Sequence, residues 1–205
     1  MAGRFWQTLT ALTLLMSPAY ATPSLTTGEE APAIAAWADF CAREPAECAV
    51  DQTETATIHL HPETIELIEA VNAYVNRTIS PLTDERHWGL VDKWDFPTDG
   101  SGDCEDFQLL KRRLLVEAGL PRRALRITVV MNRFGEGHAV LMVRTDRGDL
   151  ILDNVRPEVL PWHETDYLFV KRESDVRVGW QFFQPAAPLT VAADLRKQST
   201  SLQKQ

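Results

Sequence analysis

The centre of this chain carries a helix signature followed at once by strand signatures, and this order constrains the fold most. Asp103 is a typical N-cap residue, and Asp106 three positions later makes a variant of the capping box. Apolar residues then recur at helical spacing, and Gly119 followed by Pro121 is a common way for a helix to end. The sequence therefore predicts a helix that begins at Cys104 and ends just before Gly119.

Strand character follows this helix. Residues 126–131 are rich in β-branched side chains, and residues 137–143 are apolar on both faces, which predicts a central strand. Asp146-Arg147-Gly148 predicts a turn, and residues 149–155 predict the returning strand. If Thr145 lies opposite Gly148, then His138 and Asp153 become diagonal neighbours on one face, within reach of a hydrogen bond. A slip of one residue would place them on opposite faces.

Two helical segments are expected before the centre. Residues 34–48 predict a short helix and a loop closed by two cysteines. Pro62 suits the first turn of a helix that continues to Ile79, because apolar residues recur at helical spacing between them. Ser80-Pro81 ends this helix, since the residue before a proline avoids the helical conformation.

The chain has three cysteines, and its first residues are typical of an export signal. Arg4 precedes a mostly apolar run, and Ala19-Tyr20-Ala21 fits the small-x-small rule, so we place the cleavage after Ala21. The alternative, an uncleaved membrane anchor, would need a longer apolar run. An exporting compartment oxidises neighbouring cysteines, which predicts a Cys41–Cys48 bridge and leaves Cys104 as a lone thiol.

The composition predicts one domain between two less ordered ends. After cleavage about 180 residues remain, which suits a single domain with a sizeable core. The expected regions are a signal peptide (1–21), a loose linker rich in Thr, Pro, Gly and Glu (22–33), the domain (34–184) and a flexible C-terminal tail (185–205).

The formal net charge of −8 argues against nucleic acid and anionic membrane surfaces as partners. Two local basic clusters, Lys111-Arg112-Arg113 and Arg122-Arg123, lie toward the end of the central helix or just after it. Cations suit that end of a helix dipole, so we expect both clusters on a solvated face.

Cys104 would be the first residue of the central helix, where free N–H groups and the helix dipole favour a thiolate. Three acidic neighbours, Asp103, Glu105 and Asp106, oppose that effect. A bound cation, or carboxylates turned away from the sulfur, would resolve this conflict.

Cys104, His138 and Asp153 together supply a nucleophile, a base and a group that orients the base, which is the logic of a catalytic triad. The alternative is a cysteine buried at a helix start, a core histidine and a turn aspartate without catalysis. An unpaired cysteine in an exported chain favours the catalytic interpretation.

At these residues the chain resembles the bacterial transglutaminase-like cysteine peptidases. The similarity covers roughly residues 34–180. Its most specific motifs are 102–107 (Gly-Asp-Cys-Glu-Asp-Phe), 137–141 (Gly-His-Ala-Val-Leu) and 152–154 (Leu-Asp-Asn), with further similarity at 71–76, 92–97 and 167–172. The resemblance implies an α+β fold of the papain-like, transglutaminase type, in which the Cys-bearing helix packs on an antiparallel sheet.

The resemblance also implies roles for single residues. Cys104 corresponds to the nucleophile, His138 to the base and Asp153 to the orienting acid. The adhesin-releasing members of the family bind Ca²⁺ through acids beside the cysteine, and Asp103 and Glu105 match those positions. The family often has tyrosine where this chain has Phe107, so any role of that hydroxyl is absent here.

The resemblance therefore implies an exported, periplasmic cysteine peptidase with a protein substrate in the periplasm or at the cell surface. It also implies an inner-membrane regulatory receptor as a partner. Two other functions stay open at this point. The same triad would serve a transglutaminase-type acyl transferase or deamidase, and a non-catalytic periplasmic binding module could keep the fold without turnover.

Overall fold

The computed structural model describes residues 24–184 of the chain. Its helices and strands are, in order, β1 (Thr27–Ala31), α1 (Ala35–Arg43), α2 (Pro45–Cys48), α3 (Pro62–Thr78), β2 (Ser80–Pro81), α4 (Asp84–His87), β3 (Ser101–Gly102), α5 (Cys104–Glu117), η1 (Arg122–Ala124), β4 (Leu125–Met131), β5 (Gly137–Thr145), β6 (Gly148–Leu152), β7 (Leu160–Pro161), η2 (Trp162–Glu164), β8 (Leu168–Glu173) and β9 (Trp180–Phe183).

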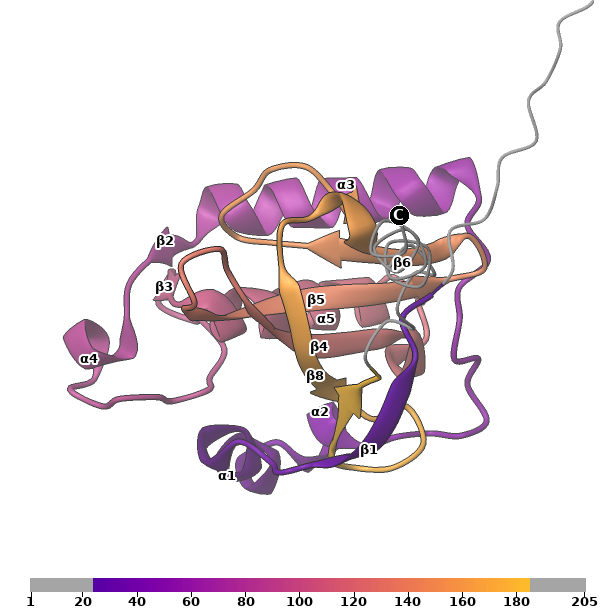
Figure 1. Ribbon diagram of the computed structural model, residues 1–205. Helices are drawn as coiled ribbons and strands as arrows, with labels where there is room; N and C mark the ends of the chain where they lie inside the picture. Colours follow the sequence, from indigo (N-terminus) through magenta and orange to yellow (C-terminus); the bar gives the residue numbers. More distant parts are fainter. Residues whose placement is uncertain (1–23, 185–205) are drawn as a thin grey trace, which may run out of the picture.

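A single mixed arrangement of helices and antiparallel strands results (Figure 1). The main sheet of the described residues has the strand order β1-β9-β8-β4-β5-β6-β7, and every neighbouring pair is antiparallel. Helix α5 lies against β4 and β5 on one face of this sheet, and α3 packs beside α5. The predicted α+β fold is confirmed.

The central helix and the hairpin match their predicted positions. Helix α5 begins at Cys104, and Gly119 beyond its end has a φ of 96°, which glycine adopts without strain. In the hairpin Thr145 lies opposite Gly148, and the β5–β6 ladder continues as far as Leu141 opposite Leu152. Asp153 therefore follows directly on the last paired residue of β6.

Strand β5 is buried on both faces, as its continuous apolar sequence predicts. Ala139, Leu141 and Val143 join the main core, which lies between the sheet and the helices α1, α3 and α5. Val140 and Met142 point to the opposite face, where they form a second cluster that also includes Val130, Ile151, Trp162, Phe169 and Phe183.

Part of the expected loose linker at 22–33 is a strand instead. Residues Thr27–Ala31 form β1, which pairs with β9 at the edge of the sheet, and the backbone N–H of Leu25 donates to Asp149 Oδ2 over 2.8 Å. The segment has no apolar alternation, so its strand depends on backbone pairing that the sequence pattern does not reveal. The predicted signal peptide and C-terminal tail lie outside the described residues.

The first two cysteines form the expected disulfide. Cys41 in α1 and Cys48 in α2 are bridged with a Cα–Cα distance of 5.6 Å, and Cys104 is free. Within residues 24–184, no helix combines the length and the apolar character that a membrane crossing requires.

The expected solvated cluster at Lys111-Arg112-Arg113 is wrong for its first two residues. Lys111 and Arg112 are fully buried, because α5 is covered by the sheet on one side and by α3 on another. The Arg112 guanidinium meets the Glu173 carboxylate in β8 at 2.5 Å. The same carboxylate accepts hydrogen bonds from the Trp37 indole N–H (2.8 Å) and the Ile127 backbone N–H (3.0 Å). One buried acid thus ties α1, α5 and β4 to β8.

This network predicts a large loss of stability for Glu173→Ala. The substitution leaves the Arg112 charge buried without its partner, which costs about 3–5 kcal/mol in free energy of unfolding. The matched control is Glu30→Ala, which removes an exposed ion pair with Arg177 and should cost about 1 kcal/mol or less. Urea unfolding followed by tryptophan fluorescence measures both. Equal losses in the two variants would contradict the prediction.

Candidate active site

Cys104 lies at the N-terminus of α5, where the helix meets β5. Its thiol is partly buried, and the backbone N–H of Ala139 favours the thiolate form. The thiol also donates to Glu105 Oε2 over 3.2 Å. Because Ala139 directly follows His138 in β5, this packing brings the sulfur to the strand that carries the histidine.

His138 and Asp153 form the contact that the hairpin register predicts. His138 Nε2 lies 2.8 Å from Asp153 Oδ1, and the two side chains are 12% and 2% exposed. This hydrogen bond occupies Nε2 and leaves Nδ1 as the ring nitrogen available to another group.

Two further groups fix the Asp153 carboxylate. The Tyr167 hydroxyl donates to Oδ2 over 2.5 Å, and the backbone N–H of Val155 donates to Oδ1 over 3.1 Å. Burial raises the pKa of Asp153, but the hydrogen bonds from His138 and Tyr167 and the charge of His138 outweigh it, so the net pKa is lowered. Asp153 is therefore ionised at neutral pH. The sequence similarity at 167–172 includes Tyr167 but predicts no role for it.

Lys111 lies on the same helix as Cys104, two turns further along. Burial lowers the pKa of Lys111 to about 7, and the charge of Asp153 opposes that shift. Its Nζ has no hydrogen-bond partner among residues 24–184. The run of basic residues did not predict that Lys111 is buried, because burial of a lysine depends on what packs over the helix.

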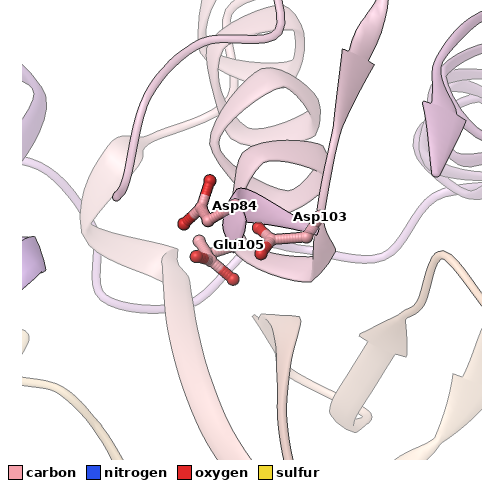
Figure 2. A group of neighbouring side chains, drawn as sticks. All are labelled: Asp84, Asp103 and Glu105. Atoms are coloured by element: carbon pink, nitrogen blue, oxygen red, sulfur yellow. The ribbon is translucent and has the colours of Figure 1, made fainter. Parts of the chain in front are cut away.

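Three acids gather in front of the first turn of α5 (Figure 2). Asp84 comes from α4, Asp103 immediately precedes α5, and Glu105 lies in its first turn. One carboxylate oxygen of each lies within 4.8 Å of the others. The family resemblance implied Asp103 and Glu105 as calcium ligands but not Asp84. Nothing in the sequence shows that α4 folds back onto this turn.

Asp103 occupies the N-cap position, but its side chain does not cap the helix as predicted. The side chain lies instead in the acid cluster, with a buried Oδ1 that has no hydrogen-bond partner among the described residues; Asp84 Oδ1 is in the same situation. The backbone N–H groups of the first turn are therefore not occupied by this carboxylate.

Burial and mutual repulsion disfavour the ionised acids. Burial, followed by the charge of Asp103, raises the pKa of Glu105 to about 10. The pKa values of Asp84 and Asp103 are also raised, mainly by burial. Burial and then the charge of Glu105 raise the pKa of the Cys104 thiol well above its usual range. The conflict between thiolate and acids that the sequence predicts is therefore present in the structure.

Gly102 precedes this cluster because a larger residue does not fit there. A Cβ at this position would lie 2.7 Å from both Cβ and Oδ2 of Asp106. Asp106 cannot easily move, because it is buried and its Oδ1 accepts a hydrogen bond from the Asp95 backbone N–H over 2.9 Å. Close approach of backbone and side chain thus explains the glycine of the Gly-Asp-Cys-Glu-Asp motif.

Gly102→Ala should therefore lower the free energy of unfolding by about 1–3 kcal/mol, the usual cost of overpacking. Gly137→Ala is the matched control, because a Cβ there meets nothing within 4 Å. Denaturant titration of both variants measures the difference, and an unchanged Gly102→Ala midpoint would show that Asp106 yields without cost.

Comparison with known proteins supplies a further finding. Residues 27–185 match the family described as bacterial transglutaminase-like cysteine proteinase. The fold is similar to calcium-bound LapG of Legionella pneumophila, with 27% sequence identity, a TM-score of 0.51, and coverage of 69% of this chain and 82% of that chain. Two other LapG structures, one of them EGTA-treated, have 28% identity and TM-scores of 0.49; they cover 67% and 66% of this chain and 76% and 78% of theirs. None of the curated proteins matches the sequence.

Proposed function

The chain belongs to the bacterial transglutaminase-like cysteine proteinase family and is a cysteine peptidase, and from this premise we propose that Cys104, His138 and Asp153 are its catalytic triad. One observation carries the proposal. The hydrogen bond between His138 Nε2 and the ionised Asp153 fixes the ring, while the helix that carries Cys104 packs on the strand that carries His138.

In the proposed mechanism His138 takes the proton of the Cys104 thiol, and the sulfur attacks the carbonyl carbon of the peptide bond. His138 then protonates the leaving amine, and the carbonyl group remains on the sulfur as a thioester. Water, activated by the same imidazole, hydrolyses the thioester and restores the thiol. The free backbone N–H groups at the start of α5 are the candidates for stabilising the oxyanion.

Asp153 acts through the histidine and makes no contact with the substrate. Its carboxylate holds the imidazole in the orientation and tautomer that the thiol needs, and it stabilises the imidazolium that forms. Tyr167 and the Val155 N–H hold the carboxylate itself. Amide acyl transfer would use the same three residues, with an amine in place of water, and amine incorporation into a glutamine peptide distinguishes it from hydrolysis.

Asp84, Asp103 and Glu105 fit a Ca²⁺ site. The ion prefers oxygen ligands at about 2.3–2.6 Å, so two oxygens bound to one ion lie no more than about 5 Å apart. One carboxylate oxygen each of Asp84, Asp103 and Glu105 meets this condition, because the three atoms lie within 4.8 Å of one another. Two of the oxygens are buried without hydrogen-bond partners within residues 24–184, as expected for atoms that accept an ion. The similar LapG structure is calcium-bound, which supports the choice of metal.

A bound calcium ion would supply the positive charge that offsets these acids beside the thiol. The chain's own part is to hold the ligands. Asp84 is fixed by the Lys93 backbone N–H, which donates to its Oδ2, and Glu105 is fixed by its place in the first turn of α5. Without the ion, these three buried carboxylates would have no positive charge to offset them beside Cys104.

For location and partners, the export signal supports a periplasmic protein, and the family supports a surface or envelope protein as the substrate. An inner-membrane regulatory receptor is proposed as a partner on the resemblance alone. Secretion of a fusion to a periplasm-dependent reporter tests the location, and crosslinking of a Cys104→Ala variant in cells tests the partners.

Asp153→Asn tests the triad. The imidazole loses its anionic acceptor, so kcat/KM should fall by about 10³–10⁴-fold while the fold is kept. Asp51→Asn is the matched control, because Asp51 is an exposed acid bonded only within its own loop. Mass spectrometry of new peptide ends in the exported proteome measures cleavage by the wild type, Asp153→Asn and Asp51→Asn. Undiminished cleavage by Asp153→Asn would show that the triad is misassigned.

Calcium removal tests the metal site. Excess EGTA should lower the activity, added calcium should restore it, and calorimetry should detect calcium binding that Asp84→Asn weakens by at least about tenfold. Asp39→Asn, an acid exposed in α1, should bind calcium as the wild type does. Full activity in EGTA together with no calorimetric signal would reject the metal and leave the acids as a structural cluster.

A further inference from the structure

A groove leads away from His138 between the β4–β5 turn and the loop that follows Asp153. Its first hollow, of about 190 Å³, is lined by His138, Gly137, Val155 and Tyr167 among others. A second hollow of about 330 Å³ shares Asn132, Val155 and Tyr167 with the first and continues past Phe134. We call this surface the Phe134–Val155 groove.

One wall of the groove is a preformed turn. The Asn132 side chain accepts hydrogen bonds from the backbone N–H groups of Phe134 (2.9 Å) and Glu136 (3.0 Å), and its amide donates to the Glu136 carboxylate over 2.8 Å. These bonds fix the turn that carries Phe134, whose side chain is 72% exposed. A large aromatic side chain is thus held in solvent at a fixed position on the wall of the groove.

The opposite wall is tied to the catalytic centre. Val155 is 65% exposed, and its backbone N–H donates to Asp153 Oδ1. Tyr167, whose hydroxyl donates to the other oxygen of Asp153, lies between the two hollows. The position of this wall relative to His138 is therefore set by the same hydrogen bonds that orient the imidazole.

Several polar groups of the groove already have partners within the chain. Arg156 pairs with Asp166, and the Glu136 carboxylate binds the Asn132 amide. The exposed features that remain are the apolar faces of Phe134 and Val155, with the Arg133 guanidinium 4.8 Å from the centre of the Phe134 ring. An apolar ligand suits this surface better than a basic one.

The mechanism fixes which part of a substrate reaches the groove. His138 protonates the leaving amine, so the chain that follows the cleaved bond must pass the imidazole. The first hollow adjoins His138. Residues after the cleaved bond would therefore enter this hollow first and the space between Phe134 and Val155 next.

We propose that the Phe134–Val155 groove binds the substrate segment that follows the cleaved bond and selects a large apolar side chain within its first few residues. This inference rests on the proposed triad and adds a specificity site to it. The apolar contact is of the kind that changes kcat/KM by about tenfold or more per substrate side chain.

The test is cleavage of a proteome-derived peptide library, with the sequences on both sides of each cut read by mass spectrometry. The wild type should enrich Leu, Ile, Met or Phe among the first four residues after the cut. Phe134→Ser and Val155→Ser should each reduce that enrichment about tenfold. The sequence preference before the cut should stay unchanged in both variants.

Val178→Ser is the matched control, because Val178 is an exposed valine (56%) away from the groove, and it should cleave as the wild type does. An alkylating probe for Cys104, which has no residues after a cleaved bond, should label the wild type, Phe134→Ser and Val178→Ser at equal rates. No apolar enrichment in the wild type, or full enrichment in both groove variants, would overturn the inference while the triad stands. If the probe labels the wild type but the wild type cleaves no peptide, the proposed peptidase mechanism is overturned, and the groove with it.

Discussion

The packing of the first turn of α5 on β5 is the constraint on which the rest of the site depends. It places Cys104 against the backbone of Ala139, the residue that directly follows His138 in β5. The core behind it, with Leu109 and Leu115 of α5 against Leu141 of β5, holds the helix in place without polar contacts. The buried Arg112–Glu173 pair then fixes the same helix to β8, so that movement of α5 would break both an apolar and an ionic contact.

Two opposite electrostatic arrangements meet at this helix start. On one side, His138 and Tyr167 keep the Asp153 carboxylate ionised although it is buried. On the other side, Asp84, Asp103 and Glu105 are buried together, and their environment disfavours both their own charges and the thiolate. A protein would not retain such a cluster for stability, because burial of unpaired carboxylates is costly. The calcium ion proposed at these acids would offset their charges and the penalty that they place on the thiolate.

The sheet connects the proposed triad with the proposed substrate groove. The β5–β6 register sets the distance between His138 and Asp153, and the residues that precede β5 and follow β6 form the walls of the Phe134–Val155 groove. Asp153 contacts the imidazole and, through Val155 and Tyr167, the groove as well. The proposed triad and the proposed groove therefore share the hydrogen bonds of Asp153, which would set the orientation of the base and the path of the leaving segment together.

The sequence by itself determined the local parts of this protein: the helix at Cys104, the turn between β5 and β6, and the Cys41–Cys48 bridge; it left the register of the hairpin conditional. Each depends on turn residues or short spacings, which act over a few residues. Only the tertiary structure brought Asp84 to the acids of α5, buried Lys111 and Arg112, and paired β1 with β9. These features depend on which surfaces of the folded chain cover one another. The sequence does not show whether an acid, a basic run or a polar segment contacts solvent or another part of the chain.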